Sequence, residues 1–126
     1  MAVVLQEIVD SDFEYFMKIT TTGTNSSTAI FDASAQAGAA TDPRTTITGV
    51  AWSVSSQTDI EWDATSNVVA LSLSGSGKVG FGDGVPSIPN NAGSGVTGDL
   101  ALSNSSASVG TIWLRMKKVS GWDNIT

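Results

Sequence analysis

The sequence contains no cysteine and no histidine, and only 14% of its 126 residues are charged. The missing cysteine excludes disulfide bonds and thiol nucleophiles. The missing histidine removes the usual general base and the commonest metal ligand. A serine nucleophile needs such a base, and Lys78 lacks the Ser-x-x-Lys spacing that would replace it. We therefore expect no enzymatic activity, no catalytic residue, no metal and no cofactor.

Positive charge is also scarce, because six Lys and Arg residues stand against twelve Asp and Glu, a formal net charge of −6. Nucleic-acid binders normally show the opposite sign or a strong basic patch, so we expect no nucleic acid as a partner. No run approaches the roughly 20 apolar residues that cross a bilayer. The first twelve residues lack the basic start of a signal peptide. We therefore expect no membrane partner.

The residues that are present favour strands. Residues 13–20, 44–54, 58–64, 68–74 and 109–119 alternate apolar side chains with polar or small ones, which is typical of half-buried strands. Turn-forming residues separate these runs at spacings of about 8–12 residues. This pattern predicts an all-β fold, either an antiparallel β-sandwich or a jelly-roll-like barrel.

At this length the chain fits one domain. We expect an extended N-terminal arm over residues 1–12 and a single β domain over residues 13–126. Residues 55–57 (Ser-Ser-Gln) are expected to turn the chain between two strands. Residues 33–43 are predicted to form an irregular loop. Residues 75–98, rich in Gly and Pro, are predicted to form a long loop of the kind that is often functional.

The four tryptophans are Trp52, Trp62, Trp113 and Trp122. The first two lie on strand faces with apolar partners, which predicts that they belong to the core. Trp113 shares the outward face of the final strand with Arg115 and Lys117, and an exposed Trp beside Arg is typical of an interface anchor. Stacking on a sugar ring, or packing beneath a loop, would also suit Trp113. We interpret Trp122 in the same way as Trp113.

Half of the positive charge of the chain lies in Arg115, Lys117 and Lys118. One interpretation is a solvated strand edge, because lysine on an exposed edge discourages aggregation. The other is an ion-paired contact with an acidic face of a neighbouring subunit. The sequence leaves both open.

The densest acidic group is Asp59, Glu61 and Asp63, which lie at period two on one side of a predicted strand, with Ile60 and Trp62 on the other side. This group fits a solvated strand face, or an interface to basic residues. A metal site is a third interpretation, although carboxylates spaced about 7 Å apart along a strand need help from loops to bind one ion.

The final amphipathic strand, Thr111–Trp122, completes a pattern that resembles a known family. In its size, acidic charge, apolar N-terminus and lack of Cys and His, the chain resembles the small Gly/Ser/Thr-rich virion structural proteins of tailed bacteriophages, especially capsid decoration (cement) proteins. The resemblance implies a β-sandwich or jelly-roll-like domain, often trimeric, that clamps the joints between major capsid protein subunits. It supplies no catalytic residues.

We therefore expect a non-enzymatic capsid decoration protein that stabilises the phage head. Its partner would be the major capsid protein, and it would form a homo-oligomer, with a trimer favoured. It would reside on the capsid surface of a virion assembled in the host cytoplasm. The expected interface residues are Val3, Val4, Leu5, Ile8, Trp113, Arg115, Lys117 and Trp122. A carbohydrate-binding or receptor-binding β module, or a tail, neck or baseplate component of the virion, would also fit the sequence.

Overall fold

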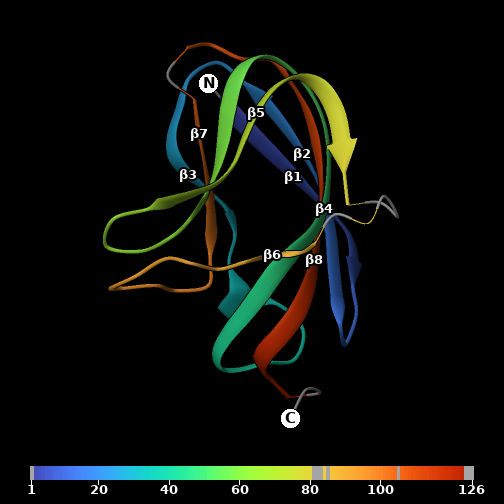
Figure 1. Ribbon diagram of the computed structural model, residues 1–126, viewed down its shortest axis with the longest axis vertical. Helices are drawn as coiled ribbons and strands as arrows, with labels where there is room; N and C mark the ends of the chain where they lie inside the picture. Colours follow the sequence, from blue (N-terminus) through green and yellow to red (C-terminus); the bar gives the residue numbers. More distant parts are fainter. Residues whose placement is uncertain (1, 81–83, 85, 105, 124–126) are drawn as a thin grey trace.

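The computed structural model describes residues 2–80, 84, 86–104 and 106–123 (Figure 1). Its elements are β1 (Ala2–Asp10), β2 (Glu14–Thr22), β3 (Asn25–Phe31), the 3₁₀ helix η1 (Ala33–Ala35), β4 (Ala39–Trp62), β5 (Val68–Val79), β6 (Ile88–Pro89), β7 (Leu100–Asn104) and β8 (Gly110–Trp122). All strand pairs are antiparallel, and the sheet curls into a half-barrel. The predicted all-β, antiparallel fold class is therefore confirmed.

The long strand β4 joins two halves of this sheet. Its residues 39–54 pair with β8, which in turn pairs with β2, and β2 with β1. Its residues 59–62 pair with β7, which pairs with β3. Strand β5 follows the opposite edge of β4, and the short β6 pairs with residues 46–47. Because the sheet is curled, the two halves turn their inner faces towards a common core (Figure 1).

The prediction of a turn at residues 55–57 is wrong, because these residues continue β4. The pairing with β5 shifts register between Val54 and Thr58, at the junction of the two halves. There the Ser56 amide donates to Ser108 Oγ at 3.3 Å, and Thr58 Oγ1 lies 3.2 Å from the same oxygen. Serine is common in turns, but here Ser56 and Ser108 form a hydrogen bond where the two halves of the sheet join. The predicted long loops are also shorter, because β4 begins at Ala39 and β5 continues to Val79.

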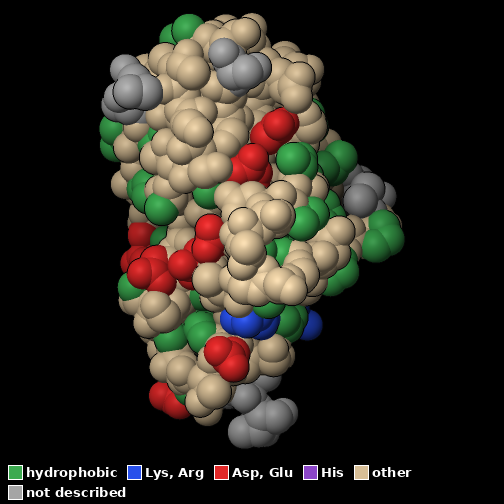
Figure 2. All heavy atoms as spheres, turned by 90° about the vertical axis from the view of Figure 1, so that its left-hand side faces the viewer, with side chains coloured by type: hydrophobic (Ala, Val, Ile, Leu, Met, Phe, Trp, Pro, Cys, Tyr) green, Lys and Arg blue, Asp and Glu red, His purple; other side chains and the backbone are tan. Residues whose placement is uncertain are grey.

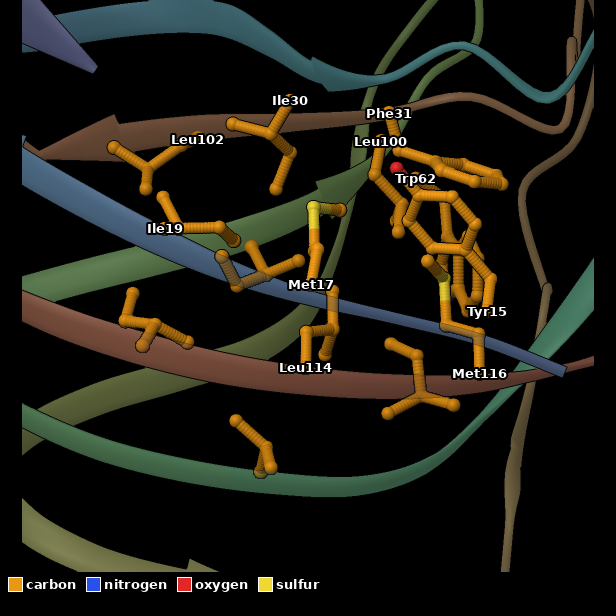
Figure 3. Close-up of a cluster of buried hydrophobic side chains, with 14 of the residues drawn as sticks. Tyr15, Met17, Ile19, Ile30, Phe31, Trp62, Leu100, Leu102, Leu114 and Met116 are labelled. Atoms are coloured by element: carbon orange, nitrogen blue, oxygen red, sulfur yellow. The ribbon is translucent and has the colours of Figure 1, made fainter. Parts of the chain in front are cut away.

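The core confirms the alternation predicted for residues 109–119 and for residues 14–20, whereas Phe13 is 58% exposed. Tyr15, Met17 and Ile19 of β2 point inwards, and the equally buried inner side chains of β8 lie beside them. Figure 3 shows these two sets meeting the side chains of β3, β4 and β7. The labelled members of this cluster are Tyr15, Met17, Ile19, Ile30, Phe31, Trp62, Leu100, Leu102, Leu114 and Met116. Burial of such side chains supplies the main driving force for folding.

Two core predictions need comment. Trp62 is fully buried, as predicted, whereas Trp52 is half-buried against the core and donates its Nε1–H to Ser74 O at 2.9 Å. Val69, an apolar residue of the alternating run 68–74, is 51% exposed. A register shift between Ile60 and Glu61 places Val69 opposite Glu61, on the outer face. A single bulge thus reverses the side on which a strand residue lies.

Strands β4 and β8 approach each other closely at Gly110, which lies opposite Val54. A Cβ at Gly110 would overlap the carbonyl oxygen of Ser53 and would lie 2.7 Å from Val54 Cα. Both atoms belong to the backbone of β4, so a side chain would require the strand itself to move. Gly110 therefore permits the pairing on which the first half of the sheet depends.

Residues 2–10, part of the predicted N-terminal arm, form the edge strand β1. The segment is extended, as predicted, but it lies within the sheet. It pairs with β2 from Ala2, opposite Thr22, to Asp10, opposite Tyr15. Strands β1 and β3, the two ends of the strand path, also contact each other.

Candidate interaction surface

The outer face of β2, β5 and β8 carries cationic and aromatic side chains. Residues directly opposite each other in an antiparallel pair share one face of the sheet. The pairing aligns two rows of residues across the sheet. The first row runs from Lys78 on β5 through Ala51 on β4 and Trp113 on β8 to Lys18 on β2. The second row runs from Gly49 on β4 through Arg115 on β8 to Phe16 on β2. Small side chains thus lie beside Trp113 and Arg115 on β4, and larger ones on β2.

The predicted outward orientation of Trp113, Arg115 and Lys117 is confirmed. Trp113 is 36% exposed, Lys117 is exposed and Arg115 is half-buried. The Arg115 guanidinium carbon lies 5.9 Å from the centre of the Phe16 ring, within the range of a cation–π contact. Phe16 and Lys18 were not identified as site residues from the sequence. Their alternation in β2 is visible there, but the pairing that brings them beside β8 is not.

The four predicted interface residues near the N-terminus are divided by the geometry of β1. Val4 is 63% exposed on the outer face, where it lies opposite Thr20. Leu5 lies on the inner side and is still 46% exposed, because β1 is an edge strand. Ile8 is 47% exposed at the register shift, and Val3 packs against the core. The strand therefore presents apolar side chains in more than one direction.

Trp122 contradicts the expectation of an exposed interface residue. It is 3% exposed, and its Nε1–H donates to the carbonyl oxygen of Arg44 at 2.8 Å. Of the two interpretations of Arg115, Lys117 and Lys118, the solvated strand edge is wrong, because β8 lies inside the sheet between β2 and β4. Lys118 is 1% exposed. Of the basic cluster, only the outward-facing members contribute to a surface.

The buried Lys118 ammonium has a complete set of partners. It forms an ion pair with Asp10 Oδ1 at 2.5 Å and donates to the carbonyl oxygens of Ser11 and Ala37, both at 2.7 Å. It also lies 4.6 Å from the centre of the Trp122 ring. Asp10 Oδ2 in turn accepts the Ala37 amide at 2.9 Å. This arrangement ties the end of β1 to β8 and to the segment before β4.

The second half of the sheet has an acidic outer side. Asp59, Glu61 and Asp63 all point away from the core, as their alternation with Ile60 and Trp62 predicted. Ile60 and Trp62 themselves are buried. Figure 2 shows the side of the molecule that carries β3 and β7, where acidic side chains gather. Among the described residues, no group of three or more acidic side chains is arranged to hold a metal ion.

Neutral groups hold these carboxylates in place. Glu61 Oε1 accepts from Ser27 Oγ at 3.1 Å, from Asn67 Nδ2 at 3.2 Å and from Ser103 Oγ at 3.3 Å. Asp63 Oδ2 accepts from Thr97 Oγ1 at 2.7 Å. In the described part of the chain none of Asp59, Glu61 and Asp63 forms an ion pair, so their negative charge is fixed but not neutralised.

Asp99 adds to this acidic side. Burial raises the pKa of its carboxyl group, and the nearby Asp32 and Asp63 carboxylates raise it further. The Ala33 amide, which donates to Asp99 Oδ1 at 2.9 Å, and the Arg44 guanidinium act in the opposite direction. The net shift is upward because burial, its largest cause, disfavours the charged form of the carboxyl group.

Tyr15 gives a pH-dependent prediction. Burial, together with the Glu7 and Asp10 carboxylates, raises its pKa from 10.0 to about 12. The folded protein therefore retains the phenolic proton more tightly than the unfolded chain does. We expect the free energy of unfolding to be unaffected by this group below about pH 10, and to fall by about 2–3 kcal/mol between pH 10 and 12.

Absorbance titration can measure this shift, because Tyr15 is the only tyrosine of the chain. The phenolate signal of the folded protein should appear near pH 12 and that of the unfolded protein near pH 10. A Tyr15→Phe variant provides the control, since it should lose this part of the alkaline decrease in stability. A phenolate signal at pH 10 from folded protein would contradict the prediction.

Comparisons with family models, with curated proteins and with solved structures found no match to this chain. Within the residues that the structure describes, no helix has the length and apolar character needed to span a bilayer.

Proposed function

We propose that this chain is a non-enzymatic structural protein of a tailed-phage virion, most specifically a capsid decoration protein. It would bind the exterior of the head and stabilise contacts between major capsid protein subunits, as a homo-oligomer with a trimer favoured. The observation that carries the proposal is the edge strand β1, whose Val4, Leu5 and Ile8 are each between 46% and 63% exposed. Soluble monomers usually protect a sheet edge with charge or short length, whereas β1 is nine residues long and six of these residues are apolar, with Gln6, Glu7 and Asp10 as its polar members.

The backbone of β1 supports the same role. Within the described residues its backbone pairs with β2 alone. Some of its residues contact β3, and the rest of its other edge can accept a strand from a partner. Such a contact combines main-chain hydrogen bonds with burial of the apolar side chains. On a capsid lattice the contact is repeated many times, so avidity makes up for a modest affinity at each copy.

Co-sedimentation tests this proposal. The probe is a set of expanded and unexpanded shells, assembled from the major capsid protein encoded in the same genome as this chain. We expect the wild-type protein to bind the shells to saturation. A Val4→Glu/Ile8→Glu variant should bind at least about tenfold more weakly, because it places charge in the apolar contact. An Ala35→Glu/Val109→Glu variant, with equal added charge at exposed positions outside β1, should bind like the wild type.

Circular dichroism of each variant should show the same β spectrum, so that loss of binding is not loss of folding. Failure of the wild-type chain to bind either form of the shell would contradict the proposed function. Equal binding by the β1 variant and the control would retain shell attachment but would exclude β1 as the contact.

A further inference from the structure

We propose that two copies of this chain bind each other head to tail, with the basic face of one copy against the acidic face of the next. The basic face consists of Lys18, Lys78, Trp113, Arg115 and Lys117 on the outer side of β2, β5 and β8. The acidic face consists of Asp59, Glu61, Asp63 and Val69 on the outer side of the second half of β4 and the start of β5. This inference goes beyond the proposed function and does not depend on attachment to a shell.

The basic face concentrates charge in a chain that is otherwise acidic. It holds four of the six cationic side chains, although the formal net charge of the protein is −6. Lys18, Lys78 and Lys117 form no ion pair within the described residues. Glu14 lies opposite Lys117 in the pairing of β2 with β8, and it too forms no ion pair there. The face therefore keeps an excess of positive charge around Trp113.

The acidic face offers the complementary surface on the same chain. Its carboxylates are oriented by neutral donors and form no ion pair within the described residues, as described above. The apolar Val69, 51% exposed, lies opposite Glu61 and adds area that gains from burial. A hollow of about 140 Å³, lined by Gln57, Asp59, Ser103 and Asn104, gives room for the end of a long side chain.

The fold prevents one copy from joining its own two faces. Both halves of the sheet direct their inner sides to the same core, so the outer sides point away from it in different directions. Strand β4 passes from one half to the other and fixes their separation. The complement of the basic face is therefore always on another molecule. Because the contact joins two different faces, it is heterologous, and it repeats into a closed ring or an open filament.

A second copy fits the basic face better than an unrelated anionic partner. Its acidic face has complementary charge, and electrostatic complementarity of this kind selects the partner and speeds encounter. Trp113 is positioned as the anchor, since interface hot spots are enriched in Trp and Arg at the centre of a patch. The small neighbours Ala51 and Gly49 on β4 leave the surface beside Trp113 and Arg115 open to close approach.

Charge exchange between the faces tests the inference. The first variant, Lys78→Glu/Lys117→Glu, alters two exposed residues of the basic face. The second, Asp59→Lys/Val69→Lys, alters the acidic face and leaves the hydrogen-bonded Glu61 intact. Sedimentation velocity at low and high salt measures association of the full chain. We expect the wild type to self-associate, and each variant alone to do so at least about tenfold more weakly.

An equimolar mixture of the two variants should form a 1:1 complex, because the second variant keeps the basic face and the first keeps the acidic one. A Trp113→Ala variant should also associate more weakly, without any change in charge. The control variant adds Glu at four exposed positions, Thr24, Ala35, Ala40 and Ala107, which gives the same total change in charge as the first variant. It should associate like the wild type.

Three results would overturn the inference. The first is a wild-type protein that stays monomeric at low salt. The second is an oligomer that neither single-face variant weakens. The third is binding of a single-stranded oligonucleotide by the monomer through the basic face, which would show a different partner. Because none of these variants alters the apolar residues of β1, failure here and failure of shell attachment are distinguishable.

Discussion

Replacing Asp10 with alanine is expected to lower the free energy of unfolding by about 3–5 kcal/mol, because it leaves the Lys118 ammonium buried without a counter-charge. The Lys118 side chain has no exposed area, whereas that of Asp10 is 11% exposed. The two carbonyl oxygens that remain, from Ser11 and Ala37, cannot neutralise a full positive charge. The same substitution also removes the acceptor of the Ala37 amide. Urea denaturation at neutral pH measures the effect.

Replacing the other member of the ion pair, Lys118, should lower the free energy of unfolding by less than Asp10→Ala does. Lys118→Met places an apolar chain of similar length against Trp122 and leaves Asp10 at a position that water reaches. After Lys118→Met the Asp10 carboxylate is still partly exposed and still accepts the Ala37 amide, whereas Asp10→Ala leaves a fully buried ammonium without its counter-charge. Lys117→Met is the matched control, since the neighbouring lysine is exposed, and it should change stability by no more than about 0.5 kcal/mol. An Asp10→Ala variant as stable as this control would contradict the prediction.

Trp122→Ala is expected to destabilise the protein by about 3–5 kcal/mol, as is usual when a buried Trp is truncated. The side chain is 3% exposed, so its removal leaves a cavity in the core. The variant also loses the hydrogen bond to Arg44 O and the aromatic ring beside Lys118. Trp122→Phe should lose less, because it keeps a ring over the ammonium. Thermal and urea unfolding of both variants measure these differences.

Trp113→Ala is the comparison that separates a core tryptophan from a surface one. Because Trp113 is 36% exposed, its truncation should change the free energy of unfolding by less than about 1 kcal/mol. Its effect should appear in self-association instead. If Trp122→Ala left stability unchanged but altered the oligomeric state, Trp122 would act at an interface, as the sequence had suggested.

The period of two in β8 already contained the information about Lys118 and Trp122. Ile112, Leu114 and Met116 alternate inwards, and the same count reaches the buried Lys118 and Trp122, with the exposed Ser120 between them. Interpreting Lys118 by its charge instead of its position led to the prediction of a solvated edge. A charged residue on an apolar face of a predicted strand indicates a buried partner, and here Asp10 near the N-terminus supplies it.

Other features depend on pairing that no single sequence displays. The alternation of β2 and β8 is local and was predicted, but their register, with Lys18 opposite Trp113, joins segments far apart in the chain. The basic face could therefore not be assembled from the sequence. The bulge that turns Val69 outwards is equally invisible, because it arises only when β5 is matched to β4. Local pattern thus predicted which residues form strands, and long-range pairing decided which faces they share.

The placement of β8 has a consequence for how the chain folds during synthesis. This strand lies between β2 and β4, although both are made long before it. Until residues 110–122 leave the ribosome, β2 and β4 each lack their partner on one edge, and each exposes a row of unpaired amides and carbonyls there. Pairings of such long sequence separation form slowly. Nascent chains of this protein should therefore be most prone to aggregate just before translation reaches β8, and to become resistant to proteases soon after it emerges.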